Sequence, residues 1–515
     1  MSGEATYIGQ LSPDQKWRWD GAAWIPAPPP APKWANLKLR VQPTWAVVAG
    51  AVFVGLVADQ ALRVGTFGLG ASMAVVSMAV VVALVGGLKR AEAWLLAVAA
   101  AAFGAWLTDR ASPWLLWPDL AAAFALLGLT SSIAVRGSML DIGAAEAAAR
   151  IANAALHLLA GAQFLVRPIL SSKSRLGAFA PVARGLLIAI PIAAVLAGLL
   201  ASADPVFASF FNLNLDFNQF ALDAFYVVAG SLITAGLVRL ALAEPIDRVS
   251  GPAWRLGTTE ALVVLVALVI LFGAFAIAQA LSASATGAEA LRTAGVTYAD
   301  YARSGFFQLL WVAGITLAVL ILFSRITGFG GRRSRAAFLV LAEVAIALTL
   351  LIVLVASSRL SLYENAYGFT MLRLYSHIFA GWVALVFLLL AADLAGLWRA
   401  RRWFVGTAVI TALGLLMAMN FADPEAIVVR LNVDRAVSTH KIDAQYLGGL
   451  SNDATPAILA ARSAIDAALW QELQTAACGG PRSYAPGPAA FNQADAEAAG
   501  ARHRSCNLPA VPSLK

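Results

Sequence analysis

This sequence is poor in charge, cysteine and histidine. Asp, Glu, Lys and Arg make up 13% of its 515 residues, about half the roughly 25% share of soluble domains. So few charges cannot cover the surface of a water-soluble protein of this length. With two cysteines, four scattered histidines and no HExxH, CxxC, P-loop or GxSxG motif, the sequence predicts no metal site and no cofactor, and an enzyme is not the favoured interpretation.

Hydrophobic residues are abundant instead. They make up 60% of the chain, and the mean hydropathy is +0.75. They occur in long runs between residues 44 and 421, each of the length that crosses a bilayer as a helix. We therefore expect an all-α polytopic transmembrane bundle in a lipid bilayer. The expected spans, about eleven, are 44–62, 65–88, 92–108, 113–135, 181–202, 221–242, 259–281, 305–324, 336–357, 375–397 and 403–421.

The basic residues favour one orientation of this bundle. If the N-terminus is cytoplasmic, 23 of the 37 Lys and Arg lie in the N-terminal segment and cytoplasmic loops, six in the opposite loops and eight in the tail. Basic residues concentrate on the cytoplasmic side of spans. With an odd number of spans, we expect a cytoplasmic N-terminus and an extracytoplasmic C-terminus. No basic stripe with interleaved aromatics occurs, so the net charge of +8 does not indicate a nucleic-acid partner.

Residues 151–166 complicate the span count. The segment is apolar but short, it contains Asn153, His157 and Gln163, and Arg150 and Arg167 flank it. It is either a twelfth span or an interfacial or re-entrant helix. We favour the second interpretation, because a further span would break the charge alternation downstream.

Both ends of the chain differ from the apolar region. Residues 1–25 are Trp-rich, and the dipeptide Asp20-Gly21 predicts a small hairpin; residues 26–43 are a Pro-rich linker. No apolar signal-peptide core precedes the first span. The tail is expected to be helical over 422–477 and poorly ordered over 478–515. Both cysteines, Cys478 and Cys506, lie in the tail, so they are either free thiols or a disulfide formed in an oxidising compartment.

Ionisable residues inside spans are candidates for function, because burying a charge in a bilayer is costly. Glu343 lies mid-span and is either a protonated structural residue or a proton-relay or substrate site. Asp119 lies just inside its span and is either an interfacial acid or part of a site. A second group lies at the outer ends of spans, where tyrosines also form ordinary aromatic belts. The full candidate set is Asp119, Asp204, Asp300, Tyr301, Arg303, Glu343, Arg373 and His377.

Four ordered motifs resemble those of a known family. They are 203–207 (ADPVF), 296–309 (VTYADYARSGFFQL), the YGFT…RLY motif of 367–375, and the tail segment 432–454. Together they resemble the bacterial membrane family named "domain of unknown function 4173", related to the 4153 set, over roughly residues 45–460. The resemblance implies a polytopic membrane protein. It implies no activity, substrate or catalytic residue.

Three functions remain open at this point. The first is a transporter-like carrier using Glu343. The second is an envelope sensor or assembly protein that binds a protein partner through its Trp-rich N-terminal element or its tail. The third is a membrane enzyme acting on lipid-linked substrates, with the outer Asp, Arg and His cluster as its site.

Overall fold

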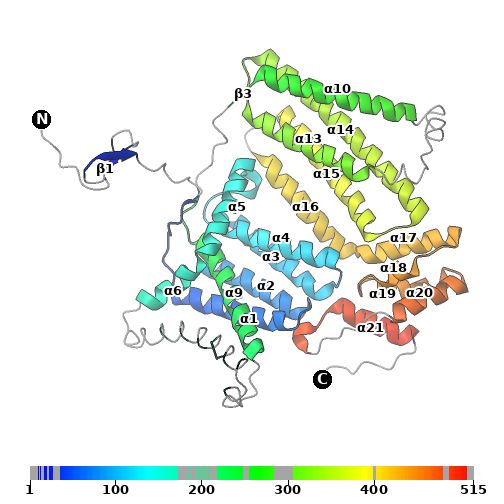
Figure 1. The fold of residues 1–515 in the computed structure, drawn as a ribbon, viewed down its shortest axis with the longest axis horizontal. Helices are drawn as coiled ribbons and strands as arrows, with labels where there is room; N and C mark the ends of the chain where they lie inside the picture. The colour runs from blue at the N-terminus through cyan, green and yellow to red at the C-terminus, as the bar shows by residue number, and fades with distance from the viewer. Residues whose placement is uncertain are drawn as a thin grey trace.

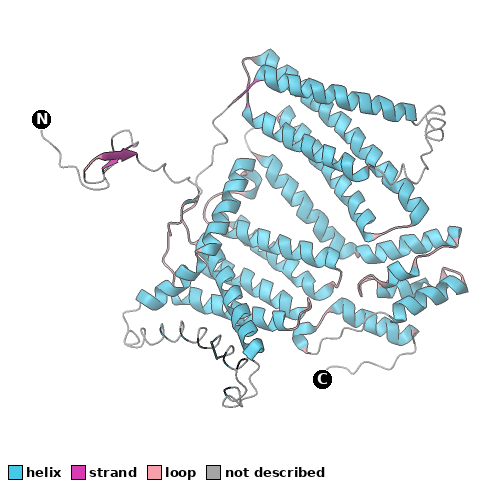
Figure 2. Ribbon diagram, in the orientation of Figure 1, coloured by secondary structure: helices cyan, strands magenta, loops and turns pink. Residues whose placement is uncertain are grey.

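The structure is a computed structural model of the whole chain. It describes residues 17–19, 22–26, 35–171, 217–246, 255–282, 305–397, 402–479 and 487–506, with a few single positions elsewhere. Figure 2 shows that these parts are almost entirely helical, with strands confined to two small pairs. The all-α fold class is therefore confirmed.

The first group of helices forms one lobe. α1 and α9 pack along each other, α2 follows α1, and α3 packs on both α2 and α4. Their buried Val, Ala, Leu and Phe side chains make one apolar core. The helices of this lobe are α1 (Trp45–Arg63), α2 (Leu69–Val85), α3 (Ala91–Asp109), α4 (Pro113–Ser132), α5 (Ala144–Leu159), α6 (Gly161–Ser171) and α9 (Phe217–Ala241), with the short 3-10 helix η2 (Met139–Asp141).

A second lobe has its own apolar core and lies above the first in Figure 1. α14 is its central helix and packs on three neighbours, α10, α13 and α15. A parallel pair of two-residue strands, β3 (Leu256–Gly257) and β4 (Thr327–Gly328), ties two of its loops together. The helices of this lobe are α10 (Thr258–Ser282), α13 (Phe306–Ile326), α14 (Arg332–Tyr367), α15 (Met371–Ala395) and α16 (Trp403–Ala422).

Nine described helices are long and apolar enough to cross a membrane, or ten if a bent pair is one span. α2 lies within the expected span 65–88 but is a shorter apolar helix of only 17 residues. The expected span 181–202 lies largely outside the described residues. α14 has 36 residues and at 1.5 Å per residue is about 54 Å long, so it extends well beyond the ~30 Å of hydrocarbon that its apolar run was expected to fill.

The ambiguous segment 151–166 belongs to the bent pair. α5 and α6 meet at an angle of 49°, and α5 runs crosswise to α3 and α4 in Figure 1. The polar side chains of α5 are buried; they are Glu146, Arg150, Asn153 and His157. A helix with this arrangement turns its polar face to the protein and its apolar face outward.

The linker before α1 packs against α5 and α9 of the first lobe. The carbonyl of Asn36 accepts hydrogen bonds from Asn153 and from Nε2 of His157. Nδ1 of His157 lies 2.6 Å from the Arg239 guanidinium, which also donates to the carbonyl of Leu37. Upstream, β1 (Trp17–Trp19) and β2 (Trp24–Pro26) form the antiparallel hairpin that the sequence predicted.

The described residues after α16 form a compact C-terminal domain on the far side of the bundle from β1 (Figure 1). Its core contains Val428, Val429, Leu447, Ile458 and Leu473. Its helices are α17 (Pro424–Thr439), α18 (Ala444–Gly448), α19 (Thr455–Ala460), α20 (Ala467–Gly479) and α21 (Gln493–Ser505), with the 3-10 turns η4 (Ala461–Ser463) and η5 (Pro488–Ala490).

Part of the expectation for this tail is corrected. Residues 478–515 were expected to be poorly ordered, yet they contain α21. Its small residues Ala494, Ala498 and Ala501 recur at helical spacing and are buried. A disulfide between Cys478 and Cys506 joins α20 to the end of α21. A bridge closing a loop of this length restricts the unfolded chain by about 3–4 kcal/mol.

Candidate functional site

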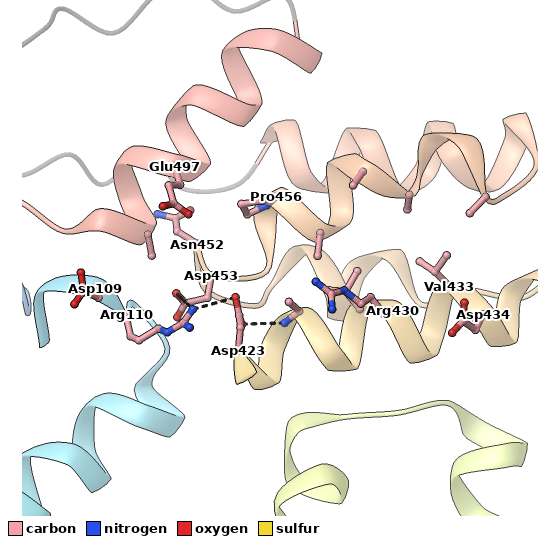
Figure 3. Close-up of a pocket in the computed structure, with 17 residues that line it drawn as sticks. Asp109, Arg110, Asp423, Arg430, Val433, Asp434, Asn452, Asp453, Pro456 and Glu497 are labelled. Carbon is pink, nitrogen blue, oxygen red and sulfur yellow. Dashed lines mark hydrogen bonds and ion pairs between the residues drawn. The ribbon is translucent and has the colours of Figure 1, made fainter. Parts of the chain in front are cut away.

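The clearest polar site lies where the two lobes and the C-terminal domain meet. The loop between α3 and α4 supplies Arg110 and Ser112 from the first lobe. The end of α16 and start of α17 supply Asp423 and Glu425, and the loop before α19 supplies Asp453. We call these five residues the junction (Figure 3 shows Arg110, Asp423 and Asp453).

Asp453 attaches the C-terminal domain to the first lobe. Its Oδ2 accepts hydrogen bonds from the backbone N–H groups of Ala111 (2.9 Å) and Ser112 (2.7 Å). Its Oδ1 lies 3.7 Å from the Arg110 guanidinium and accepts no hydrogen bond from the described residues. The side chain is only 1% exposed, so this carboxyl group is held almost entirely out of water.

Glu425 forms the second connection. Its Oε1 accepts a 2.6 Å hydrogen bond from the Ser112 hydroxyl, and its Oε2 accepts from both the backbone N–H and the hydroxyl of Ser451. Because Ser112 and Ser451 come from different parts of the fold, the carboxyl group of Glu425 holds the α3–α4 loop, α17 and the loop before α19 together.

Arg110 is the only cation among the junction residues. It forms an ion pair with Asp423 at 3.1 Å and donates hydrogen bonds to the carbonyl of Asn420 at the end of α16. Asn420 in turn donates a 2.8 Å hydrogen bond to Asp119, which is fully buried in α4. This chain of contacts connects the second lobe to the first.

Asp423 begins α17 in an unusual conformation. Its φ is +53°, in the left-handed region where Asp is one of the few tolerated residues. Its Oδ1 accepts a hydrogen bond from Ala426, and Pro424 occupies the first helical position. The sharp turn lets α16 pass directly into α17 without a linker.

The pKa values of Asp453 and Glu425 rise because burial removes water from these two carboxyl groups. For Asp453, desolvation is the main cause, and the neighbouring Asp423 and Glu425 add to it; the pKa rises to about 7. The pKa of Glu425 is also raised by desolvation, although its bonds from Ser112 and Ser451 oppose the change. Asp453 therefore titrates well above the range of an ordinary carboxyl group.

A pocket of about 430 Å³ opens beside these residues. Its floor consists of small apolar side chains of α17, α19 and α21, including Ala426, Val429 and Ala457. Its charged lining residues are Asp109, Arg110, Asp423, Arg430, Asp434, Asp453 and Glu497, drawn in Figure 3. Acidic groups outnumber the basic ones, five to two.

The predicted candidates are divided among several places. Asp119 contacts the junction through Asn420, as described. Glu343 lies in α14, partly buried, with its Oε1 lacking a hydrogen-bond partner among the described residues. Among the described residues, no hydrogen bond or ion pair connects Glu343 to the other candidates. Asp204, Asp300, Tyr301 and Arg303 lie outside the described residues.

Arg373 and His377 belong to a separate cluster where α14 meets α15. His377 pairs with Glu364 at 2.9 Å, a partner that the sequence analysis missed. Arg373 stacks on the Tyr363 ring, 4.2 Å from its centroid, and donates to the carbonyl of Gly368. These contacts connect two helices of one lobe, and no nucleophile with an adjacent base is present among them.

None of the five junction residues was selected as a functional candidate from the sequence, although four of them are charged residues in segments that the sequence analysis considered. Arg110 is one of the six basic residues in the loops opposite the cytoplasmic side, and Asp423 and Glu425 lie at the start of the tail that was expected to be helical over 422–477. Asp453 lay in the fourth family motif, which was the one signal that could have identified it. The hydrogen bonds that matter come from backbone N–H groups more than 300 residues away in sequence, which no local pattern shows.

Comparison with known proteins supports a family assignment. The family described as "Domain of unknown function (DUF4153)" matches residues 93–461, well over half of the chain. The chain belongs to the DUF4153 family. The match confirms the expected relation to the 4153 set and does not show the 4173 family itself. The match includes every junction residue, and the family's description names no activity. No curated protein and no solved structure matches the chain.

The pKa of Asp453 gives a testable pH dependence. A carboxyl group with a raised pKa in the folded state binds its proton more tightly there, so stability falls as pH rises from about 4 to about 7. We expect the melting temperature of the detergent-solubilised protein to fall between pH 5 and pH 8. The contribution of Asp453 to the free energy of unfolding drops by at most about 3 kcal/mol over this range, about two pKa units at 1.36 kcal/mol each.

The variant Asp453→Asn should flatten this dependence, because its amide oxygen still accepts from Ala111 and Ser112 but does not titrate. Glu425, whose pKa is also raised, leaves a residual slope. Glu472→Gln, at an exposed position on α20 of the same domain, is the matched control and should keep the full slope. A melting temperature that rises over this pH range, or an equal slope in Asp453→Asn, would contradict the assignment.

Proposed function

We propose that this DUF4153 protein is an envelope sensor, in which occupancy of the junction pocket by a small solute changes how the two membrane lobes are held. The observation that carries the proposal is the position of the pocket. Its lining comes from the end of α3 in the first lobe, from α17 directly after α16 of the second, and from α19 and α21.

The C-terminal domain is attached to both lobes. On the first lobe, Asn492 donates to the carbonyl of Arg110, and the backbone N–H of Leu69 donates to Phe491. On the second, Asn432 exchanges hydrogen bonds with the backbone of Phe369. A solute that repositions the pocket walls therefore acts on both lobes at once, which is the physical requirement for signalling by a binding site.

The lining favours a cationic solute with a short aliphatic part. Asp109, Asp434 and Glu497 are exposed at the rim, and no ion pair holds them among the described residues. Alanine, valine and proline side chains form the floor. Ammonium groups at the rim and methylene groups on the floor would complement both surfaces.

The ligand class can be tested with 1,4-diaminobutane as the probe and succinate as a probe of opposite charge. We expect the diamine to stabilise the purified full-length protein against heat and succinate to have no effect. Asp434→Asn and Glu497→Gln should each weaken diamine binding about fivefold, the effect of losing about 1 kcal/mol from an exposed charge pair.

Glu472→Gln is the matched control, since Glu472 is exposed on α20 away from the pocket. Equal weakening by this control, or stabilisation by succinate alone, would refute the ligand class. Hydrogen exchange in α17 and the α3–α4 loop should slow when the diamine is bound. Binding without any change in these segments would argue against the sensor function.

We further propose that the N-terminus is cytoplasmic and the C-terminal domain extracytoplasmic, in a bacterial inner membrane. The charge bias of the loops supports this orientation, as does the position of the only disulfide in the C-terminal domain. The hairpin and the C-terminal domain lie at opposite ends of the bundle in Figure 1, where each is accessible to a protein partner on its own side.

Reporter fusions test the orientation. Alkaline phosphatase fused after Lys515 should be active, because it folds with its disulfides only outside the cytoplasm, whereas a fusion in the loop near residue 136 should be inactive. The reverse pattern would overturn the orientation.

A carrier is the second candidate, favoured by one observation. Glu343 is an acid in the apolar part of α14 with an oxygen that lacks a hydrogen-bond partner among the described residues, as in proton-coupled sites. In proteoliposomes with an imposed pH gradient, a carrier should lose about tenfold or more of its proton-coupled solute flux in Glu343→Gln. Glu260→Gln, in the first turn of α10, is the control. Unchanged flux in Glu343→Gln would exclude this candidate.

A further inference from the structure

A second cavity lies inside the membrane part of the protein. It has a volume of about 590 Å³ and is lined by α4, α5, α9 and α16. The first three helices belong to the first lobe and α16 belongs to the second, so the cavity is a groove between lobes. It lies toward the end of the bundle where the N-terminal linker is bound, since it reaches Ser132 at the end of α4 and Val405 near the start of α16.

The lining is almost wholly hydrocarbon. Of the 20 lining residues, only Ser132 and Arg150 carry polar side chains. The guanidinium of Arg150 donates to Glu146 through Nε and Nη2 and to the carbonyl and hydroxyl of Ser132 through Nη1. These polar groups are therefore satisfied within the protein.

This chemistry determines what can fill the groove. A buried water needs two to four polar partners, and a polar ligand needs unsatisfied donors or acceptors; the lining supplies neither. An empty groove would deprive its walls of van der Waals contacts. A hydrocarbon chain is the occupant that matches the lining.

The groove is continuous with the surface that faces the bilayer. On α5, Ile151 is 72% exposed and Leu158 is 39% exposed, and both line the groove. The same helix buries its polar face against the linker and α9. Because the exposed face of α5 is apolar, membrane lipid is the phase next to the groove.

We propose that the groove holds one acyl chain of a phospholipid from the leaflet on the N-terminal side, packed between α5 of the first lobe and α16 of the second. The chain completes the contact between the lobes at this end, as the junction does at the other. The head group remains at the membrane surface and makes no contact that the proposal requires.

Two substitutions fill the groove from different walls. Gly128 on α4 lines it, and a Cβ added there meets no atom within 4 Å; Ala155 on α5 lines it and is exposed. In Gly128→Leu and Ala155→Leu, the new leucine side chain therefore occupies space in the groove that the acyl chain would fill. Gly381→Leu is the matched control, because Gly381 is exposed on α15, also has open space around it, and lies outside the groove.

The first measurement is native mass spectrometry of the full-length protein released from detergent. We expect one phospholipid to be retained by the wild type and by Gly381→Leu. The amount of retained phospholipid should fall about fivefold or more in Gly128→Leu and Ala155→Leu. This factor is the low end of the effect expected when an added side chain overpacks a tightly packed site. Size-exclusion profiles and helical circular dichroism show whether each variant is folded.

The second measurement uses proteoliposomes of phosphatidylethanolamine and phosphatidylglycerol containing a small fraction of phospholipid with a diazirine on its acyl chain. On irradiation we expect adducts on α5 and α16 peptides that contain Ile151 and Val409, and loss of these adducts in Gly128→Leu. If the wild type shows no such adducts, or the folded variants keep both the adducts and the retained lipid, the proposal is wrong. Labelling by a diazirine-bearing prenol but not by the phospholipid would also overturn it.

Discussion

The arrangement of the molecule depends on one buried carboxyl group. Asp453 accepts two backbone hydrogen bonds from the loop between α3 and α4, and it does so from a domain that is continuous in sequence with the second lobe. Each lobe has a separate apolar core. In a bilayer, apolar surfaces gain little from leaving lipid for one another. Polar contacts such as this one are therefore what specifies how the lobes are placed.

The junction reaches this specificity at a cost in desolvation. Asp119, Glu425 and Asp453 are each nearly or fully buried, and Arg110 is the single cation among the junction residues. Burying several acids around one cation is unfavourable unless hydrogen bonds replace the lost water. Ser112, Ser451 and Asn420 supply these bonds. The same low polarity that raises the pKa of Asp453 makes the junction sensitive to any charged group that enters the pocket beside it.

The sequence was sufficient to predict the class of fold, because crossing a bilayer requires long apolar runs and excludes charge. Helices were expected over every described span for this reason, and the hairpin followed from its turn dipeptide. The limits of α14 were less predictable, since Glu364 and Tyr367 lie in a polar stretch that helix packing, not hydropathy, keeps helical. α21 was missed because its alanine face is meaningful only once a disulfide and a neighbouring helix are known to face it.

The candidate site was less accessible to prediction than the fold. Searching for charges inside spans selected Glu343 and Asp119, and Asp119 does contact the junction through Asn420. The residues that organise the site lie instead in loops and at helix ends, where a charge is ordinary and attracts no notice. His377 was selected as a candidate, but its partner Glu364 lies on a helix whose predicted end fell before it. Pairing across elements is a property of the packed structure.

α16 connects the two proposed binding sites. Its last turn carries Asn420, which holds Arg110 and Asp119, and it continues without a linker through Asp423 into the pocket. Near its start, Val405 and Val409 line the apolar groove. The helix has 20 residues and is about 30 Å long, so it spans the hydrocarbon core once as a rigid rod. A tilt that opens the groove must therefore move Asn420 against the junction, and a change at the junction must alter the space left for an acyl chain. If the acyl chain and the solute favour different tilts of α16, binding of one changes the affinity for the other. By linkage, the change in binding free energy is the same in both directions.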